Sequence, residues 1–198
     1  MRVYGITGPS GSGKSILSKY MTKSGVAHID ADRVYHELLV PPSEVLDALR
    51  CSFGDQIFNS SGLLDRTVLS SIVFNDKEKL ALLNKTVLDF VLKEIRRRIA
   101  SLEKSGVSAV AIDAPTLIES GFHKECDTVI SVLSPKEDRI KRIMERDGLS
   151  IEKATERTNA QKPDKFYEEY SDIILMNDGD IDAFFERISA SLPELESK

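Results

Sequence analysis

The chain has 198 residues, 41% hydrophobic and 30% charged, a composition typical of a soluble globular protein with one domain. Its 27 basic and 32 acidic residues give a net charge of −5, which argues against a protein that binds nucleic acid through a basic face. No apolar run approaches the ~18 residues of a membrane span. The two cysteines, Cys51 and Cys126, are too few for a disulfide framework and favour reduced thiols in a cytoplasmic protein.

Short apolar runs alternate with segments of helical periodicity along much of the chain. Buried strands are predicted at residues 3–7, 26–29, 107–113, 128–133 and 173–176, and helices at 15–23, from Pro135 onward and at 181–192. This alternation indicates an α/β fold, a three-layer α/β/α arrangement with a five-stranded parallel sheet. Residues 43–104 stay helical, with Asp65 and Asp76 as expected caps, so they are predicted to form a helical insert.

A glycine-rich loop directly follows the first predicted strand. Residues 8–15 fit the pattern G-x-x-x-x-G-K-[ST], with a strand before and a helix after. Such a loop turns backbone N–H groups toward a phosphate, and the N-terminus of the next helix favours negative charge. Lys14 is expected to reach the β- and γ-phosphates, and the Ser15 hydroxyl to bind Mg²⁺. The residues predicted to bind the nucleotide here are Gly8, Pro9, Ser10, Gly11, Ser12, Gly13, Lys14, Ser15 and Ile16.

The loop indicates a nucleoside triphosphate but does not define the reaction. A GTPase would carry an Asn-Lys-x-Asp motif to read the base, whereas residues 84–87 read Asn-Lys-Thr-Val inside a predicted helix. The small size of the chain favours a small-molecule kinase over a mechanical ATPase. From the motif, two alternatives stay open: a kinase for a nucleoside monophosphate or a small alcohol, and a nucleotide-binding switch without catalysis.

Three aspartates follow predicted strands, at the sheet edge where ligands bind in such folds. Asp32 is predicted to be the base that accepts the proton of the acceptor hydroxyl, and Asp30 to contact the acceptor or the waters of Mg²⁺. For both, capping of the next helix is the structural alternative. Asp113 ends the apolar run 109–112 in the Walker-B arrangement that holds Mg²⁺, with strand-end capping as its alternative.

Basic residues concentrate late in the chain, where nine of the 27 lie within residues 136–165. Arg142 and Arg146 share one face of a predicted helix, which a turn joins to a second helix. A helical hairpin with such arginines is typical of a lid that stabilises the charge of a transferred phosphoryl group. Arg139 shares this face with Arg142 and Arg146. A solvated face paired with acidic neighbours is the structural alternative for all three, and it is the expectation for Arg139. With Lys14, this concentration explains how an acidic chain can bind an anionic substrate.

Together these motifs resemble the dephospho-CoA kinase family. Residues 5–15, followed by Asp-Ala-Asp at 30–32, are similar to the family's phosphate loop and acceptor motif, and Asp-Ala-Pro-Thr-Leu-Ile-Glu at 113–119 is similar to its Asp-x-Pro-Leu-Leu-Phe-Glu. Further similar positions are 53–57, 62–66, Leu69, Val73-Phe74, Arg142, Arg146-Asp147, Arg157, Gln161 and Asn177-Asp178-Gly179. The resemblance extends over residues 3–180.

The resemblance implies ATP-dependent phosphorylation of the ribose 3′-hydroxyl of dephospho-CoA, the last step of coenzyme A synthesis, with ATP and Mg²⁺. The implied site residues are Lys14, Asp32, Arg142 and Arg146 for catalysis, Ser15 and Asp113 for Mg²⁺, Asn177 near the adenine, and Asp30, Asp32, Pro115 and Leu117 for the acceptor. One P-loop kinase domain is expected over residues 1–198, with a core of 1–42, 105–135 and 166–198, an acceptor-binding helical insert at about 43–104 and a lid at about 136–165. The expected enzyme is a cytoplasmic monomer or weak homo-oligomer, without nucleic acid or membrane partners.

Overall fold

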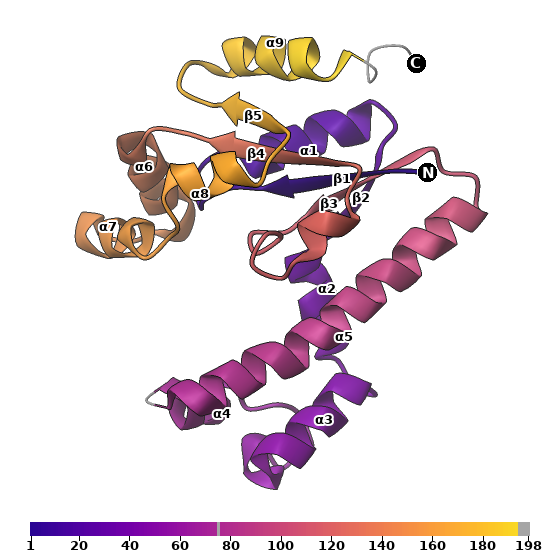
Figure 1. Cartoon of the computed structure of the whole chain (residues 1–198). Helices are drawn as coiled ribbons and strands as arrows, with labels where there is room; N and C mark the ends of the chain where they lie inside the picture. Colours follow the sequence, from indigo (N-terminus) through magenta and orange to yellow (C-terminus); the bar gives the residue numbers. More distant parts are fainter. Residues whose placement is uncertain (75, 194–198) are drawn as a thin grey trace. The chain divides into compact units, whose positions relative to one another are not determined.

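The computed structural model describes residues 1–74 and 76–193 of the chain (Figure 1). Contacts within the chain define two compact units. The first comprises Met1–Ile29 and the chain from Leu102 onward, and the second comprises Asp30–Ser101. Each unit has an apolar core of its own.

The first unit is built on a twisted sheet whose central strand is β1 (Arg2–Thr7). The other strands are β2 (Ala27–Asp30), β3 (Ala109–Asp113), β4 (Thr128–Leu133) and β5 (Ile173–Met176), and the order is β2-β3-β1-β4-β5. Strand β1 runs parallel to β3 and β4, and β4 runs parallel to β5. The segments that follow Thr7, Asp113 and Leu133 therefore leave the sheet at the same edge, as the sequence predicts.

Apolar side chains cover both faces of this sheet. Helices α1 (Lys14–Lys23) and α9 (Ile181–Ser191) pack on one face, because Leu17, Met21, Phe184 and Ile188 form one cluster with strand residues such as Ile130. On the other face, Leu133 packs with Ile118 and with Tyr167 of the short helix α8 (Asp164–Glu169). The three-layer α/β/α fold predicted from the sequence is thus confirmed.

Helices α6 (Lys136–Asp147) and α7 (Ile151–Asn159) follow β4 and pack against each other. Gly148 ends α6 in the left-handed conformation, with its N–H bonded to the carbonyl of Met144, and Ser150 caps α7. These two helices form the predicted hairpin. Between β3 and β4 lies a short 3₁₀ turn, η2 (Phe122–Glu125).

The described residues of the second unit form helices and turns, with one isolated antiparallel bridge between Phe58 and Leu64. Its elements are α2 (Ala31–Leu38), α3 (Glu44–Phe53), the 3₁₀ turn η1 (Asp55–Ile57), α4 (Arg66–Phe74) and α5 (Lys77–Lys104), the last of which continues into the first unit. Asp65 and Asp76 accept hydrogen bonds from the first N–H groups of α4 and α5, so both predicted caps are confirmed. The core residues are Leu39, Val45, Leu46, Leu49, Phe53, Ile57, Leu69 and Val73.

The described residues include no helix that is both long and apolar enough to cross a membrane.

Candidate functional site

The loop between β1 and α1 can take its shape only with glycine at three positions. Gly8, Gly11 and Gly13 all have positive φ, which residues with a side chain rarely adopt. Space is also lacking: a Cβ at Gly8 would overlap the carbonyl oxygen of Val132, and a Cβ at Gly11 would lie 2.7 Å from the carbonyl oxygen of Arg139. The backbone of the loop therefore lies directly against β4 and α6.

Two polar side chains of this loop are suited to an anionic ligand. Lys14 directs its ammonium group back along the loop and donates to the carbonyls of Gly8, at 2.7 Å, and Pro9, at 3.1 Å. The Ser12 hydroxyl is buried, and it has no hydrogen-bond partner among the described residues. A buried polar atom without a partner is costly, and a phosphate oxygen is an acceptor that would satisfy it.

Asp113, at the end of β3, is connected to the helix that follows the loop. Ser18, buried on α1, donates to Asp113 Oδ2 at 2.8 Å, and His28 Nε2 lies 3.9 Å from the same oxygen. Ser18 stands one turn after Lys14 and Ser15, so Asp113 is fixed beside the first turns of α1. Among the described residues, no three His, Cys, Asp or Glu side chains gather as a metal site. Asp113 and Ser15 supply hard oxygen ligands, the type that Mg²⁺ prefers when phosphates complete its coordination.

A second set of contacts supports the loop from the ends of β4 and β5. Asn177, directly after β5, donates from Nδ2 to the Ser12 carbonyl at 2.7 Å. Arg142 on α6 donates to the Gly11 carbonyl at 3.0 Å and to the Ser134 hydroxyl at 2.9 Å. The sequence interpretation assigns Arg142 to phosphate charge, and the structure places its guanidinium on backbone carbonyls of the phosphate loop.

The hairpin also contacts the loop through Ser10. Arg146 donates to the Ser10 hydroxyl at 3.3 Å, and Gln161 accepts a hydrogen bond from the Ser10 N–H at 3.0 Å. Asp147 accepts hydrogen bonds from both Arg146 and Arg157 at 2.8 Å. The hydrogen bond from Arg146 lowers the pKa of the Asp147 carboxyl and raises the pKa of Arg146 itself. The structure therefore pairs two arginines of the hairpin, Arg146 and Arg157, with the same acidic residue.

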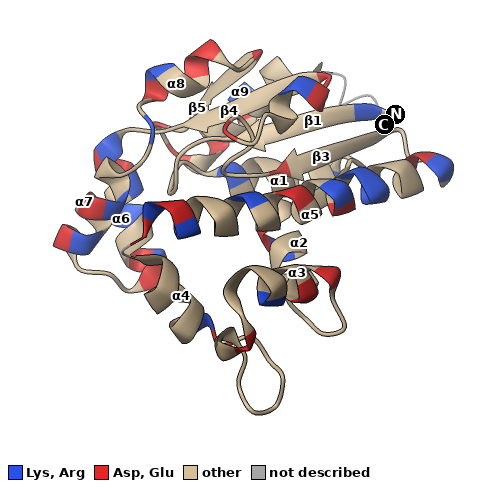
Figure 2. Ribbon diagram, turned by 60° about the horizontal axis from the view of Figure 1, so that its bottom comes forward, with Lys and Arg blue, Asp and Glu red and all other residues tan. Residues whose placement is uncertain are grey.

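Residues 136–165 are less uniformly basic than the count of arginines and lysines indicates. Seven acidic residues lie in the same segment as the nine basic ones. Figure 2 shows charges of both signs on α6 and α7. The expected concentration of cations is therefore partly neutralised within the hairpin.

The expectation that Arg139 lies on a solvated face is wrong. Arg139 is only 7% exposed, and it stands one helical turn before the buried Ile143 on the same face of α6. Its guanidinium lies 3.9 Å from the carboxylate of Asp164, and two of its nitrogens have no hydrogen-bond partner in the described part of the chain. The nearby charges of Glu119, Arg139 and Asp164 act on Tyr167, whose burial is the main cause that raises its pKa to about 12.

Three further predicted site residues have well-defined packing. Pro115 follows β3, and its carbonyl accepts a hydrogen bond from the Thr7 hydroxyl at 3.3 Å. Leu117 is fully buried, and its side chain occupies the space beside Gly5. Ile16 packs against the core cluster of the sheet. The roles predicted for these residues in ligand binding stay predictions.

In the helical unit, the two aspartates of the Asp-Ala-Asp motif differ in what they do locally. Asp30 is the N-cap of α2, because its Oδ1 accepts a hydrogen bond from the Arg33 N–H at 3.1 Å. Asp32 lies in the first turn of α2 and is exposed, and its carboxylate makes no hydrogen bond or ion pair among the residues described. Capping therefore accounts for Asp30 and leaves Asp32 available for chemistry.

Comparison with known proteins decides among the kinase families that share such a loop. The family model described as dephospho-CoA kinase matches residues 2–183. The chain belongs to the dephospho-CoA kinase family. It is 35% identical over 196 residues to a dephospho-CoA kinase of Carboxydothermus hydrogenoformans, covering 99% of this chain and 95% of the relative.

Solved structures agree with this membership. A dephospho-CoA kinase from Campylobacter jejuni superposes with a TM-score of 0.72 at 27% identity, over 98% of each chain. A shikimate kinase from Acinetobacter baumannii, 14% identical, superposes with a TM-score of 0.58 over 98% of this chain and 94% of its own, which shows a shared fold alone.

Three polar residues that orient side chains of this site were not predicted from the sequence. Ser18 holds Asp113, His28 lies beside the same carboxylate, and Ser134 joins Arg142 to the carbonyl of Asn177 through a 2.7 Å hydrogen bond. Ser18 alone carried a usable signal, because it stands four residues after Lys14 and thus on the same face of α1. His28 and Ser134 acquire their roles only through the register of the sheet.

Proposed function

We propose that this chain transfers the γ-phosphoryl group of ATP to the ribose 3′-hydroxyl of dephospho-CoA and so produces coenzyme A. Membership of the dephospho-CoA kinase family over residues 2–183 supports the substrate pair. The observation that carries the proposal is the phosphate loop itself, whose buried Ser12 hydroxyl lacks a protein partner among the described residues and whose glycines admit no side chain.

In this proposal the residues of the loop bind and orient the triphosphate. The backbone N–H groups from Gly8 to Ser15 and the Ser12 hydroxyl hold phosphate oxygens, and Ile16 and Asn177 lie on the nucleotide side. Lys14 exchanges its two carbonyl acceptors for phosphate oxygens and neutralises charge that develops during transfer.

Mg²⁺ would be held by the Ser15 hydroxyl and, through waters, by Asp113. The bound metal supplies charge neutralisation on the β- and γ-phosphates. Ser18 keeps the Asp113 carboxylate in one orientation through its 2.8 Å hydrogen bond. The small donor set fits Mg²⁺, which usually keeps several waters and binds few protein carboxylates.

Asp32 is the residue proposed to accept the proton of the 3′-hydroxyl. Its carboxylate is exposed and is not consumed by capping, unlike that of Asp30. Arg142 and Arg146 would stabilise the transferred group, Arg146 after release from Asp147. Asp30, Pro115, Leu117 and the helical insert are proposed for the acceptor side. We expect a cytoplasmic enzyme that acts as a monomer or weak homo-oligomer, without nucleic acid or membrane partners.

A coupled assay of ADP release tests this function with dephospho-CoA as acceptor and Mg²⁺ present. The proposal expects turnover that depends on dephospho-CoA, and no such turnover in the wild type would exclude it. Shikimate, nucleoside monophosphates and small alcohols are assayed in parallel, because faster turnover of one of these would identify it as the acceptor in place of dephospho-CoA. Lys14→Ala should lower kcat/KM by about 100-fold or more, since it removes a cation from the transferring phosphates.

The chain offers a matched control for Asp32. Asp180-Ile181-Asp182 at the start of α9 repeats the arrangement of Asp30-Ala31-Asp32, with Asp180 as the cap and Asp182 exposed in the first turn. Asp32→Asn should reduce kcat by about 100-fold or more with little change in the KM for ATP. Asp182→Asn removes the same charge from the same kind of helix position and should leave kcat unchanged. Equal kcat values for the two variants would show that Asp32 is not the base.

A further inference from the structure

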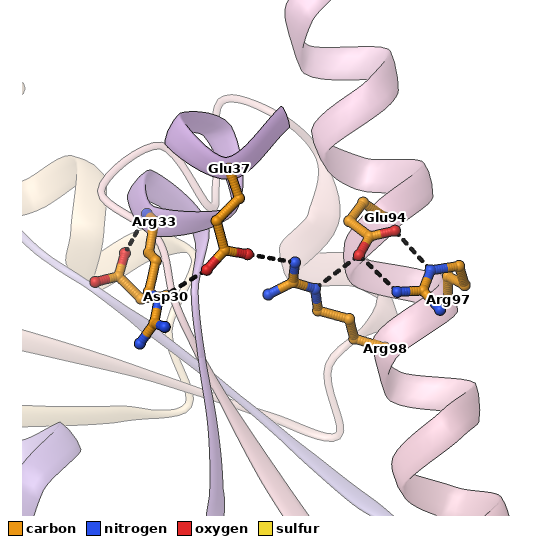
Figure 3. A network of polar contacts seen from close by, with 6 residues as sticks. All are labelled: Asp30, Arg33, Glu37, Glu94, Arg97 and Arg98. Carbon is orange, nitrogen blue, oxygen red and sulfur yellow. Dashed lines mark hydrogen bonds and ion pairs between the residues drawn. The ribbon is translucent and has the colours of Figure 1, made fainter. Parts of the chain in front are cut away.

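A chain of charged side chains connects α2 and α5 within the helical unit (Figure 3). Arg98 on α5 donates from Nη2 to Glu37 of α2 at 2.6 Å and from Nε to Glu94 at 2.8 Å. Glu37 also accepts from Arg33 at 2.8 Å, and Glu94 from Arg97 at 2.7 and 2.9 Å. All these residues lie within Asp30–Ser101.

Within this network of side chains, Arg98 on α5 is the residue that forms a hydrogen bond to α2. Its planar guanidinium donates in two directions at once, which the single ammonium of a lysine cannot reproduce with the same geometry. The side chains of Arg98 and Glu94 are 30% and 16% exposed, so this part of the network is shielded from water more than an ordinary surface ion pair. The hydrogen bond from Arg98 is the main cause that lowers the pKa of Glu37, so the carboxylate stays ionised.

Helix α2 depends on such external contacts for its position. It has eight residues, of which only Val34 is buried, and a helix of this length is not stable on its own. Glu37 lies in its last turn and is bonded both to Arg98 and, through Arg33, to the first turn. The residue before Arg33 is Asp32. The contact with Arg98 therefore restrains the turn that carries the proposed base.

We propose that Arg98 is a positioning residue for Asp32: it holds α2 against α5 through Glu37 and so fixes the carboxylate that accepts the acceptor proton. This inference rests on the proposed function, because it gives Arg98 an effect on turnover only through Asp32. A small displacement of a catalytic group can lower the rate by up to about 100-fold, so a loosened helix has a measurable consequence.

The test compares Arg98→Gln with Arg97→Gln, a matched control on the same helix. Both variants remove one arginine and one partner of Glu94, but Arg97 has no hydrogen bond or ion pair to α2 among the described residues. Arg98→Gln should lower kcat about tenfold and leave the KM for ATP within about twofold. Arg97→Gln should keep the wild-type kcat. Glu37→Ala, which removes the acceptor from the side of α2, should reproduce the effect of Arg98→Gln.

A second readout separates positioning from general loss of structure. In an Asp32→Asn background, Arg98→Gln should cause no further fall in kcat, because the group it positions is already disabled. A similar fall in both backgrounds, or equal kcat values for Arg98→Gln and Arg97→Gln, would overturn the proposal. Arg98→Lys, which keeps the charge and one donor group, should give an intermediate kcat.

Hydrogen–deuterium exchange distinguishes this inference from the proposed function. Amides of α2 should exchange faster in Arg98→Gln than in Arg97→Gln, whatever the acceptor of the enzyme is. If the wild type does not turn over dephospho-CoA, the proposed function fails. If the wild type is active and α2 exchanges equally in both variants, the positioning role of Arg98 fails while the proposed function stands.

Discussion

Asn177 donates from its side-chain amide to the backbone carbonyl of Ser12 at 2.7 Å, and this bond joins the end of β5 to the phosphate loop across 165 residues of sequence. Asn177 is only 3% exposed. Its own carbonyl accepts a hydrogen bond from Ser134, which also accepts one from Arg142. The loop is therefore held by Asn177 after β5 and by Arg142 on α6, which Ser134 connects to each other, as well as by its glycines.

Replacement of Asn177 should weaken both the fold and nucleotide binding. Asn177→Ala removes a buried donor and leaves the Ser12 carbonyl without that partner, so the free energy of unfolding should fall by about 1–3 kcal/mol. The KM for ATP should rise severalfold, because the loop is held less firmly. Chemical denaturation and ATP kinetics measure the two effects. Asn59→Ala is the control: Asn59 supports an exposed turn in the helical unit, so the KM for ATP should not change. An unchanged KM in Asn177→Ala would contradict this account.

Gly8 in the phosphate loop and Gly25 after α1 allow backbone strain to be distinguished from steric overlap. Gly8 and Gly25 both have positive φ, but a Cβ at Gly8 would overlap the Val132 carbonyl, whereas a Cβ at Gly25 has nothing within 4 Å. Gly25→Ala should cost only about 1–2 kcal/mol of stability, the penalty of a left-handed residue. Gly8→Ala should cost several kcal/mol more or prevent folding. Thermal unfolding of both variants gives the comparison, and equal melting temperatures would refute it.

The sequence was sufficient for the parts of the site whose chemistry depends on neighbours in the chain. The loop from Gly8 to Ser15 needs its spacing to surround a phosphate, and apolar runs of four to six residues marked the strands that position it. The strand boundaries at Thr128–Leu133 and Ile173–Met176 agree with the prediction. At these positions the residue pattern of the segment itself determines the local structure, so the sequence is sufficient to predict it.

Features that depend on tertiary contacts were not accessible in the same way. Arg139 has the sequence appearance of a surface residue, yet it is buried in the fold, with its guanidinium 3.9 Å from Asp164 of α8. The six-residue helix α8 is too short to show a strong helical periodicity in the sequence. It is held in place by Tyr167, which packs against Leu133 of the sheet. The link from Ser18 to Asp113 spans 95 residues and requires the parallel register of β1 and β3. Contacts between residues distant in sequence limited the predictions for Arg139 and Ser18, and a weak local signal limited the prediction of α8.

Glu94 should make the stability of the protein depend on pH. Hydrogen bonds from Arg97 and Arg98 lower its pKa from 4.5 to about 2, although burial acts in the opposite direction. A carboxyl whose pKa is lowered in the folded state stabilises the fold at pH values above its pKa in the unfolded chain. This contribution is lost as the pH falls from about 4.5 toward 2. Glu94→Gln should therefore cost up to about 3 kcal/mol at pH 7, the equivalent of the full pKa shift, and progressively less below pH 4.5.

Denaturation of wild type and Glu94→Gln at pH 7, 5, 4 and 3 measures this difference. Glu145→Gln serves as the control, because Glu145 lies exposed on α6 and makes no ion pair within the described residues. Its stability should differ little from that of the wild type at each pH. A cost of Glu94→Gln that is the same at pH 7 and pH 3 would show that lost packing, and not the ionised carboxylate, accounts for the effect.

The two cysteines should differ in reactivity toward thiol reagents. Cys51 is exposed on α3, whereas Cys126 lies beside Gly5, and burial raises its pKa to about 12. Since the thiolate is the reactive form, a thiol-specific reagent at pH 8 should modify Cys51 quickly and Cys126 only after unfolding. Mass spectrometry of the folded protein should find one modification, at Cys51, and Cys51→Ser should abolish it. Two fast modifications in the folded wild type would show that the environment of Cys126 is more open than its contacts with β1 indicate.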